Sequence, residues 1–401
     1  MVVVFWCSVA VVVYVYLGYP VLLSLGLRVR AGRSRTSARL DERSTGETVP
    51  GVSIVIAARN EAARLGPRIE NLLSLDYPAD RRQIIVVSDG STDATPDVLG
   101  GYAGVVDAVT VPAGGKALAL NAGVARATFD LLVFADARQA FASDALRELV
   151  APFDNPSVGA VTGELLLDAE SPCRRLGRER RAAGHRPEAR TQAGDGRIAE
   201  RRVTARSTIA DGVGLYWRYE KQLRRMESAV DSTLDATGAI YAMRRSLFTP
   251  LPADTVLDDV LTPMRVVLSG SRVVFNERAR AFDRASADAD AEVRRKIRTL
   301  AGNYQILALE PRLLLPWRNR VWWQYASHKL ARLVVPYALL TAFASSLALA
   351  TVHVFYLLAL AVQVGLYLLA GCGAVIEHRE RFANGSAAAG RPLPEPMRES
   401  A

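Results

Sequence analysis

Apolar residues occur in this chain as two long uncharged runs near its ends and as short periodic runs in between. Residues 2–27 carry no charge over 26 positions, which is enough for one helix to cross a bilayer. Residues 333–376 carry none over 44 positions, which predicts a hairpin of two spanning helices with a break near 351–353. The pattern therefore predicts three membrane spans around a polar central part.

Cationic residues beside these runs predict the orientation of the chain in the membrane. They follow the first run at Arg28, Arg30, Arg33 and Arg35, and the last run at Arg379 and Arg381. Because Lys and Arg stay on the cytoplasmic side, we expect an integral inner (plasma) membrane protein with its N-terminus outside and its central part in the cytoplasm. A cleaved signal peptide fits less well, because the first run is long and lacks a basic start.

Residues 311–332, directly before the hairpin, mix Trp and Tyr with Arg and Lys. Aromatic bodies with cationic tips suit the headgroup layer of a membrane, so we expect an interfacial helix here. An ordinary surface helix is the alternative.

Short apolar runs in the central part predict its fold class. The runs at 52–58, 84–87 and 131–135 are rich in Val, Ile, Leu and Ala, which is typical of strands buried on both faces. After the first run, apolar residues recur at helical spacing and stop before Pro78. Strands that alternate with helices predict an α/β domain with a mostly parallel, helix-flanked sheet.

Polar residues stand where these strands end. Glu61 follows the first strand, Asp89 the second and Asp136 the third, while Lys116 follows two glycines at a helix start. Carboxyl ends of parallel strands meet at one edge of a sheet, where open α/β sheets bind ligands. The four residues therefore suit a nucleoside-diphosphate site with a divalent metal. The alternatives are a simple turn and helix cap at 88–93, and a solvated helix start for Lys116.

The distribution of charge and of Cys and His limits the kinds of partner and metal site that we expect. The formal net charge is +9, but residues 174–206 alone hold 11 arginines and 4 acidic residues, a net +7. No basic groove with interleaved aromatics occurs elsewhere, so a nucleic-acid partner is not expected. The stretch 171–211 lacks a hydrophobic period and predicts a disordered basic insertion, with attraction to anionic lipids as the alternative. Three scattered cysteines and four histidines predict neither a disulfide framework nor a zinc site.

The order of motifs resembles glycosyltransferase family 2 with the GT-A fold, a Rossmann-like sheet flanked by helices, over roughly 50–168 and 212–310. The resemblance rests on Ala-Arg-Asn-Glu ending at Glu61, Ser-Asp-Gly-Ser-Thr-Asp around Asp89, Gly-Lys-Ala at Lys116, and Asp136 after its strand. Further motifs lie at 237–244, which resembles the acceptor segment, at 257–259, in the place of Thr-Glu-Asp, and at 295–299, in the place of Gln-x-x-Arg-Trp.

The resemblance implies a role for each of these residues. It implies that Glu61 and Asp89 contact the nucleoside, that Asp136 holds the metal and the diphosphate, and that Asp259 is the general base. Family members invert the anomeric carbon, so the base takes the proton of the acceptor hydroxyl as that hydroxyl attacks. The cations that would stabilise the leaving diphosphate are a divalent metal (Mg²⁺ or Mn²⁺), Lys116, Arg295 and Arg298. Gly238 lies in the acceptor segment.

Three departures from the family pattern affect these expectations. The second aspartate of the Asp-x-Asp metal motif is Arg138, which can itself pair with phosphate and lower the dependence on metal. The Gln-x-x-Arg-Trp box keeps only Arg298, which favours transfer of one or a few sugars over processive synthesis. Asp258 and Asp259 are adjacent, and in a strand they would face opposite ways, so Asp258 is the alternative base.

We therefore expect a membrane-bound inverting glycosyltransferase of the hexosyltransferase type, working at the cytoplasmic face. Its partners would be a nucleotide sugar (a UDP-sugar), a lipid-linked or glycan acceptor, and membrane lipids. A catalytically degenerate scaffold of the same fold is one alternative, and a nucleotidyltransferase is a weaker one. In chain order, the expected parts are an anchor (1–27), a linker (28–50), the catalytic domain (51–310), the interfacial helix (311–332), the hairpin (333–376) and a cytoplasmic tail (377–401).

Overall fold

The computed structural model describes residues 1–33, 49–168, 208–284 and 289–389. Most of the basic stretch 171–211, most of the linker and the end of the tail lie outside these residues, so the expectations for them stay predictions. The chain divides into two compact units, one made of Met1–Gly18 with Ala331–Ala401 and the other of Tyr19–Leu330. Each unit is described by itself.

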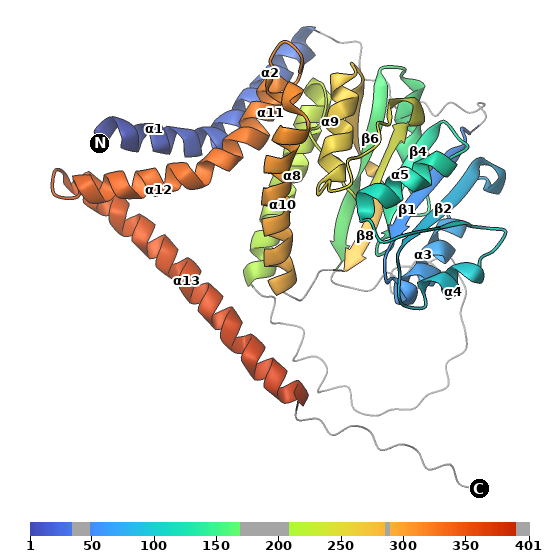
Figure 1. Ribbon diagram of the computed structural model, residues 1–401. Coiled ribbons are helices and arrows are strands. Elements are labelled where there is room, and N and C mark those ends of the chain that lie inside the picture. Colours follow the sequence, from blue (N-terminus) through green and yellow to red (C-terminus); the bar gives the residue numbers. More distant parts are fainter. Residues whose placement is uncertain (34–48, 169–207, 285–288, 390–401) are drawn as a thin grey trace, which may run out of the picture. The chain divides into compact units, whose positions relative to one another are not determined.

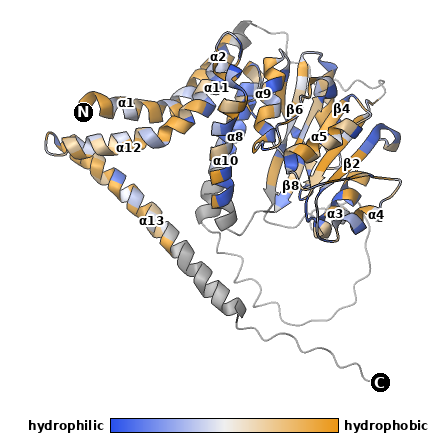
Figure 2. Cartoon of the chain, viewed as in Figure 1, coloured by the Kyte–Doolittle hydropathy of each residue, from blue (hydrophilic) through white to orange (hydrophobic). Residues whose placement is uncertain are grey.

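The first unit consists of long apolar helices (Figure 1). They are α1 (Val2–Val13), the π-helical turn η1 (Tyr14–Gly18), α12 (Ala331–Leu349) and α13 (Val354–Ala389). Helix α1 packs along α12, where the Ser8 and Thr341 hydroxyls lie 2.7 Å apart. Figure 2 colours much of these helices as hydrophobic, and apolar residues such as Leu340 and Leu369 are exposed, as expected for segments that face lipid.

Three helices are long and apolar enough to cross a membrane among the described residues: Val2–Val29, Trp322–Leu349 and Val354–Gly373. They agree with the expected three spans, and the break of the hairpin lies at 350–353 as predicted. Residues 311–332 do not form the single interfacial helix that was expected. They form η6 (Pro311–Leu314), irregular chain, α11 (Trp322–Tyr325) and the π-helical turn η7 (Ala326–Leu330), which runs into α12.

The second unit is built on an eight-stranded sheet, counted over the described residues, with the order β3-β2-β1-β4-β7-β6-β8-β5. The strands are β1 (Val52–Ala58), β2 (Arg82–Asp89), β3 (Asp107–Val111), β4 (Leu131–Asp136), β5 (Ala140–Phe141), β6 (Val158–Asp168), β7 (Ile240–Arg244) and β8 (Arg272–Arg284). Strands β3, β2, β1 and β4 are parallel neighbours, whereas β7 pairs antiparallel with both β4 and β6. The sheet is therefore mixed: the half β3-β2-β1-β4 is parallel, as the sequence predicted, and β6 and β8 form a further parallel pair in the other half.

Helices cover both faces of this sheet (Figure 1). One face carries α3 (Ala62–Leu73), α4 (Thr95–Gly100) and α6 (Ala145–Val150), and the other carries α5 (Lys116–Arg126), α9 (Asp258–Leu268) and the end of α10 (Ala289–Leu309). Strand β1 serves both layers, because Ile54 and Ile56 point into the first core and Val55 into the second. Short 3₁₀ turns complete the chain: η2 (Ala79–Arg81), η3 (Ala151–Asp154) and η5 (Arg245–Leu247).

Three parallel strands end at the same edge of the sheet. In the strand register Ala58 lies opposite Ser88, and Ala57 lies opposite Asp136. Arg59, Asp89 and Asp136 therefore emerge side by side, which confirms the common edge that the sequence predicted. The helix α8 (Thr208–Val230) and the segment 231–238 precede β7 in the chain.

Candidate functional site

Asp89 shapes the glycine turn that precedes α5. Its carboxylate is 3% exposed and accepts hydrogen bonds from the backbone N–H of Gly114 (2.6 Å) and of Gly115 (3.0 Å to Oδ2). Gly115 has φ +89°, a left-handed conformation that favours glycine. Gly90 also turns left-handed, and a Cβ there would lie 2.7 Å from the backbone nitrogen of Ala113. Asp89 thus holds the backbone that places Lys116 at the start of α5.

The loops after β1 and β2 are joined by side chains. The side-chain oxygen Oδ1 of Asn60 accepts from the Thr92 N–H at 2.8 Å, and Asp93 accepts from the N–H groups of Ala62 (3.2 Å) and Thr95 (3.0 Å). These bonds satisfy the N-terminus of α3 and hold the loop before α4. The Glu61 carboxylate pairs with Arg64 at 2.8 Å, on the same loop.

Lys116 joins two acidic residues from different elements. Its ammonium lies 3.3 Å from Asp136 Oδ1, at the end of β4, and 3.2 Å from Asp258 Oδ2, at the start of α9. Burial by itself would lower the pKa of Lys116, but Asp258, Asp136 and Asp259 outweigh it and hold that pKa above its usual range. Lys116 is therefore a fixed positive charge at the strand edge.

Asp258 and Asp259 form the first turn of α9, so the expectation that they lie in a strand is wrong. Carboxylates are favourable there, because the N-terminus of a helix carries partial positive charge. Adjacent helical residues point in different directions. Asp258 faces Lys116, whereas the Asp259 carboxylate faces Gly238, where a Cβ would lie 3.0 Å from Asp259 Oδ2. The two aspartates consequently differ in surroundings.

Asp259 has the properties of a base that works near neutral pH. Burial, and then the charge of Asp258, raise the pKa of its carboxyl to about 7, although Lys116 acts in the opposite direction. The side chain remains partly exposed, so an acceptor can approach it. A general base is most effective when its pKa lies near the working pH.

The Arg138 side chain extends towards strand β8. Its guanidinium lies 3.6 Å from Asp283 Oδ2 on β8, and the same oxygen accepts a hydrogen bond from Gln139 at 2.8 Å. Arg138 follows Asp136 by two residues in the chain. Its side chain is 43% exposed, so a ligand at the strand edge can still reach the guanidinium.

Arg295 and Arg298 lie on the face of α10 that meets the loop before α9. Gly302 packs against this loop, since a Cβ there would lie 2.5 Å from the Leu257 side chain. Gln305 accepts from the Val256 N–H at 2.9 Å. At helical spacing, Arg298 and Arg295 lie on the same face one and two turns earlier. Both are exposed in this structure.

The described residues contain no group of three or more His, Cys, Asp or Glu side chains arranged to hold a metal. Asp136 nevertheless fits an ion that is held chiefly by a diphosphate, because Mg²⁺ is commonly bound by one or two carboxylates together with substrate phosphates. The Asp136 side chain is 32% exposed at the strand edge, so it is accessible to such an ion.

Reasoning from the sequence missed several residues around this site. The Tyr241 ring on β7 is 1% exposed, and burial followed by Asp258 and Asp259 raises the pKa of its hydroxyl well above the usual value. Asp235 and Lys329 form an ion pair near Asp259 that no spacing in the sequence indicated. The one signal in the sequence was the position of Lys329 beside the apolar run 333–376. Ionisable residues in membrane spans are commonly functional.

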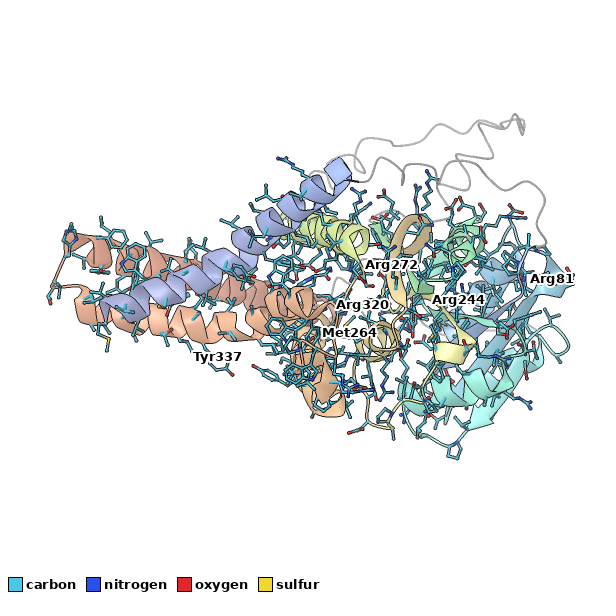
Figure 3. All side chains as sticks on the ribbon, turned by 90° about the horizontal axis from the view of Figure 1, so that it is seen from above. Arg81, Arg244, Met264, Arg272, Arg320 and Tyr337 are labelled. Carbon is cyan, nitrogen blue, oxygen red and sulfur yellow. The ribbon has the colours of Figure 1, made fainter. Side chains whose placement is uncertain are left out.

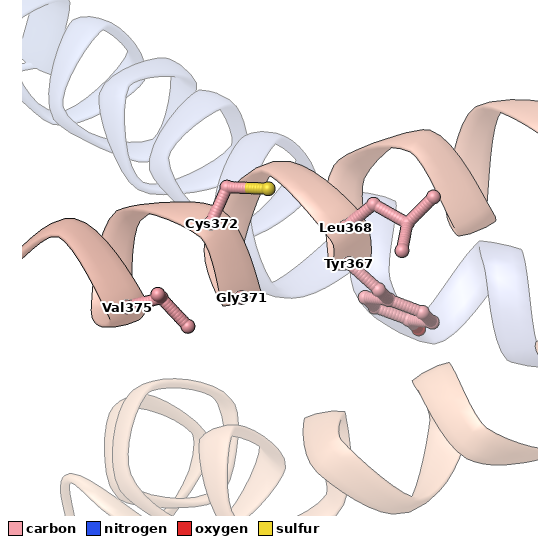
Figure 4. Close-up of a pocket in the computed structure, with 5 residues that line it drawn as sticks. All are labelled: Tyr367, Leu368, Gly371, Cys372 and Val375. Atoms are coloured by element: carbon pink, nitrogen blue, oxygen red, sulfur yellow. The ribbon is translucent and has the colours of Figure 1, made fainter.

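The first unit has a surface pocket on α13 (Figure 4). It is lined by Tyr367, Leu368, Gly371, Cys372 and Val375. The lining is apolar and holds no carboxylate or cation, so the pocket offers nothing for group transfer.

Comparisons with known proteins show what this chain is similar to. A family model described as glycosyl transferase family 2 matches residues 53–248. The beta-monoglucosyldiacylglycerol synthase of Synechocystis sp. is 36% identical over 118 residues, which are 28% of this chain and 25% of that protein. The poly-beta-1,6-N-acetyl-D-glucosamine synthase of Staphylococcus epidermidis is 33% identical over 125 residues, 30% of each chain. The matches thus span only about a quarter to a third of these curated relatives.

A solved structure confirms the fold over most of the chain. The mannosyltransferase PcManGT from Pyrobaculum calidifontis, in complex with GDP-Man and Mn²⁺, superposes with a TM-score of 0.62 over 91% of this chain and 92% of that one. The sequence identity is 21%, so the likeness concerns the GT-A fold alone.

Proposed function

We propose that this chain, whose residues 53–248 belong to glycosyl transferase family 2, transfers a sugar from a nucleoside-diphosphate sugar to an acceptor hydroxyl at the membrane. One observation carries the proposal: Lys116 lies between Asp136 and Asp258, with the raised-pKa carboxyl of Asp259 directly beside this cluster. A positive charge and a base at the edge of one sheet are what an inverting transfer requires.

Asp259 is the base of the proposed reaction. It takes the proton of the acceptor hydroxyl while the hydroxyl oxygen attacks the anomeric carbon from the side opposite the leaving group. The bond from that carbon to the diphosphate breaks, and the configuration inverts. Gly238 fits this role as the floor of the acceptor position, because its lack of a side chain keeps the approach to the Asp259 carboxylate open.

Lys116 balances the charge of the leaving nucleoside diphosphate. Electrostatic stabilisation of developing charge commonly lowers the barrier of such reactions more than any other single effect. Arg138, Arg295 and Arg298 are further cations that can reach the diphosphate. A divalent ion, when bound, adds positive charge to the phosphate oxygens, and Asp136 is the carboxylate that would hold it. The Mn²⁺ of the PcManGT complex supports the proposal of a divalent ion.

The nucleoside half of the donor binds at the ends of β1 and β2. Asp89 fixes the glycine turn through the N–H groups of Gly114 and Gly115, and Glu61 lies on the neighbouring loop. PcManGT is in complex with GDP-Man, whereas the sequence predicts a UDP-sugar for this chain, so the donor base is left to experiment. The UDP-sugar expected from the sequence is one arm of that test.

The acceptor is lipid-linked or a growing glycan, presented at the cytoplasmic face. Three candidate spans hold the catalytic unit at the bilayer, with the N-terminus outside. The relative from Synechocystis is a diacylglycerol glucosylation enzyme by name and the one from Staphylococcus is a glycan synthase by name, which supports both acceptor classes.

The test is a donor panel with the full chain in detergent and membrane lipid. UDP- and GDP-sugars are each incubated with Mg²⁺, Mn²⁺ or chelator, and the released nucleotide and the anomeric configuration of the product are measured. We expect nucleoside diphosphate from one donor and an inverted product. Release of pyrophosphate would instead assign a nucleotidyltransferase, and no turnover with any donor would assign a scaffold.

A further inference from the structure

The segment 231–238 lies directly behind the proposed base. The Ala236 N–H donates to the Asp259 carbonyl oxygen at 2.8 Å, and Gly238 faces the Asp259 carboxylate. The Thr237 hydroxyl donates to the Gly163 carbonyl oxygen at 2.9 Å, which fixes the segment to β6. The position of Asp259 therefore depends on this segment.

Asp235 is the charged residue of the segment, and two cations hold it. Lys329 donates to Asp235 Oδ2 at 2.5 Å, and Arg224 Nε lies 3.0 Å from Asp235 Oδ1. Arg224 also donates to the Thr237 hydroxyl at 3.0 Å. The Asp235 and Lys329 side chains are only 17% and 16% exposed. Burial would raise the pKa of Asp235, but Arg224 and Lys329 outweigh it and keep that pKa well below the usual range.

The first residues of the segment are fixed as well. Arg272 donates to the Asp231 carbonyl oxygen at 2.9 Å, and Arg320 donates to the Asp231 carboxylate at 3.1 Å (Figure 3). Ser232 is fully buried and its hydroxyl accepts from the Val273 N–H at 3.1 Å. Both ends of the segment are thus fixed by cations from other elements.

Lys329 comes from the start of the candidate span Trp322–Leu349, inside the π-helical turn η7. In this turn two consecutive residues face acids: His328 Nδ1 lies 2.6 Å from Glu227 Oε1, and Lys329 contacts Asp235. Tyr19, from the span Val2–Val29, donates to the same Glu227 oxygen at 2.6 Å. π-Helical turns frequently occur at functional sites, and ionisable residues in spans are functional by default.

Charges around Asp259 act on it in opposite directions. Asp258 and Asp235 raise the pKa of Asp259, whereas Lys116 and Lys329 lower it. The charged and titratable groups that face Asp259 come from six elements or segments: Lys116 (α5), Arg224 (α8), Asp235 (231–238), Tyr241 (β7), Asp258 (α9) and Lys329 (η7). Asp235 and its two partners, Lys329 and Arg224, form the ion pairs among these groups that do not involve the donor site.

We propose that Lys329 and Arg224 are positioning residues for the base: they clamp Asp235, and through the segment 231–238 they fix the place and charge surroundings of Asp259. The start of a membrane span thereby becomes part of the catalytic apparatus. The inference rests on the proposed function, in which Asp259 is the base.

The experiment compares four variants of the full chain with wild type. Lys329→Met removes one cation, Lys329→Arg keeps the charge, Asp235→Asn removes the acid, and Lys329→Met with Asp235→Asn removes the pair. Lys221→Met is the matched control, because Lys221 pairs with Glu164 and Glu277 on another surface. For each we measure the pH–rate profile, the donor KM, thermal unfolding, and the infrared carboxyl band that is lost in Asp259→Asn.

The expected result is a pair of opposite shifts. Loss of Lys329 moves the acid limb and the carboxyl titration to higher pH by roughly half a unit or more, because Lys329 no longer lowers the pKa of Asp259 and Asp235 keeps only Arg224 as its cation. Asp235→Asn moves both to lower pH, the double variant returns towards wild type, and Lys329→Arg and Lys221→Met stay close to wild type. The donor KM changes less than twofold in each folded variant.

The inference is overturned if Lys329→Met unfolds like wild type and has the same pH profile and carboxyl titration, or if the two single variants shift in the same direction. The infrared titration needs no turnover. An inactive wild type would therefore refute the proposed function. The shifts of the carboxyl band would still show whether Lys329 and Asp235 set the surroundings of Asp259.

Discussion

Two residues at the strand edge, Lys116 and Asp259, divide the proposed chemistry between them. Lys116 carries a positive charge that the surrounding carboxylates stabilise, and Asp259 carries a carboxyl that burial and Asp258 keep protonated to higher pH. The same cluster of charges thus raises the pKa of the Lys116 ammonium and, together with burial, the pKa of the Asp259 carboxyl.

The pH dependence of the rate follows from the raised pKa of Asp259. The base works only as a carboxylate, and its pKa in the folded protein is about 7 instead of 3.8. We expect the rate to rise about tenfold per pH unit below 7 and to level off above it. Steady-state rates between pH 5 and 9 check this, and a rate that is flat down to pH 5 would contradict it.

Replacement of Lys116 by Met should affect the chemical step more than donor binding. The leaving diphosphate loses a fixed cation, for which we expect a fall in kcat of about 10²–10³-fold. The acid limb should also move to higher pH, because Lys116 lowers the pKa of Asp259. Lys116→Arg, which keeps the charge, is the control, and an unchanged kcat in Lys116→Met would refute the role.

At the scale of elements, the motif at 88–93 and the glycine turn before α5 form one unit. The sequence indicated Asp89 as a nucleoside contact, or a turn with a helix cap within 88–93. Asp93 accepts from the Thr95 N–H at the start of α4, the helix that follows, and also from the Ala62 N–H of α3, while both oxygens of Asp89 are engaged by the N–H groups of Gly114 and Gly115. The spacing placed these residues at the correct edge, but the partner of a carboxylate depends on how the loops fold together.

Asp89→Ala should therefore weaken the turn as well as the donor site. Two backbone N–H groups lose a buried acceptor, which costs about 1–3 kcal/mol of unfolding free energy. We expect lower thermal stability and a donor KM raised about tenfold or more. Asp97→Ala, which removes an exposed carboxylate of α4, should leave both unchanged. Wild-type stability and KM in Asp89→Ala would disprove the account of this turn.

Helix α9 shows where sequence reasoning fails at this scale. Its first turn carries Asp258 and Asp259, which were considered as neighbours in a strand. Its apolar residues, among them Val260, Leu261 and Met264, recur at helical spacing and pack on the sheet in the same core as α5. The helical spacing was therefore present in the sequence, and the strand was the wrong choice for this stretch.

At the scale of the whole molecule, the apolar runs predicted the three candidate spans, because length and lack of charge suffice for that. The ion pair of Lys329 with Asp235 joins residues 94 positions apart, and it has no signature in local sequence. Such contacts follow from the packing of complete elements, which is why the clamp was missed while the strands and the site edge were predicted.

The orientation of the spans can be tested with the cysteines of the chain. Cys7 and Cys372 are free, and both are exposed. With the N-terminus outside, Cys7 lies near the outer end of the first span and Cys372 near the inner end of the third. In intact cells, a membrane-impermeant maleimide should label a variant that retains only Cys7. A variant that retains only Cys372 should be labelled only after the cells are lysed. The reverse pattern would contradict the orientation.

The central claim is that Asp259 is the base of an inverting transfer, and Asp259→Asn tests it most directly. Single-turnover rates with the active donor should fall about 10³-fold at pH 8, with donor affinity unchanged and with loss of the acid limb. Asp130→Asn, which changes a side chain that is 97% exposed, should match wild type. A folded Asp259→Asn protein that turns over at the wild-type rate would contradict the account.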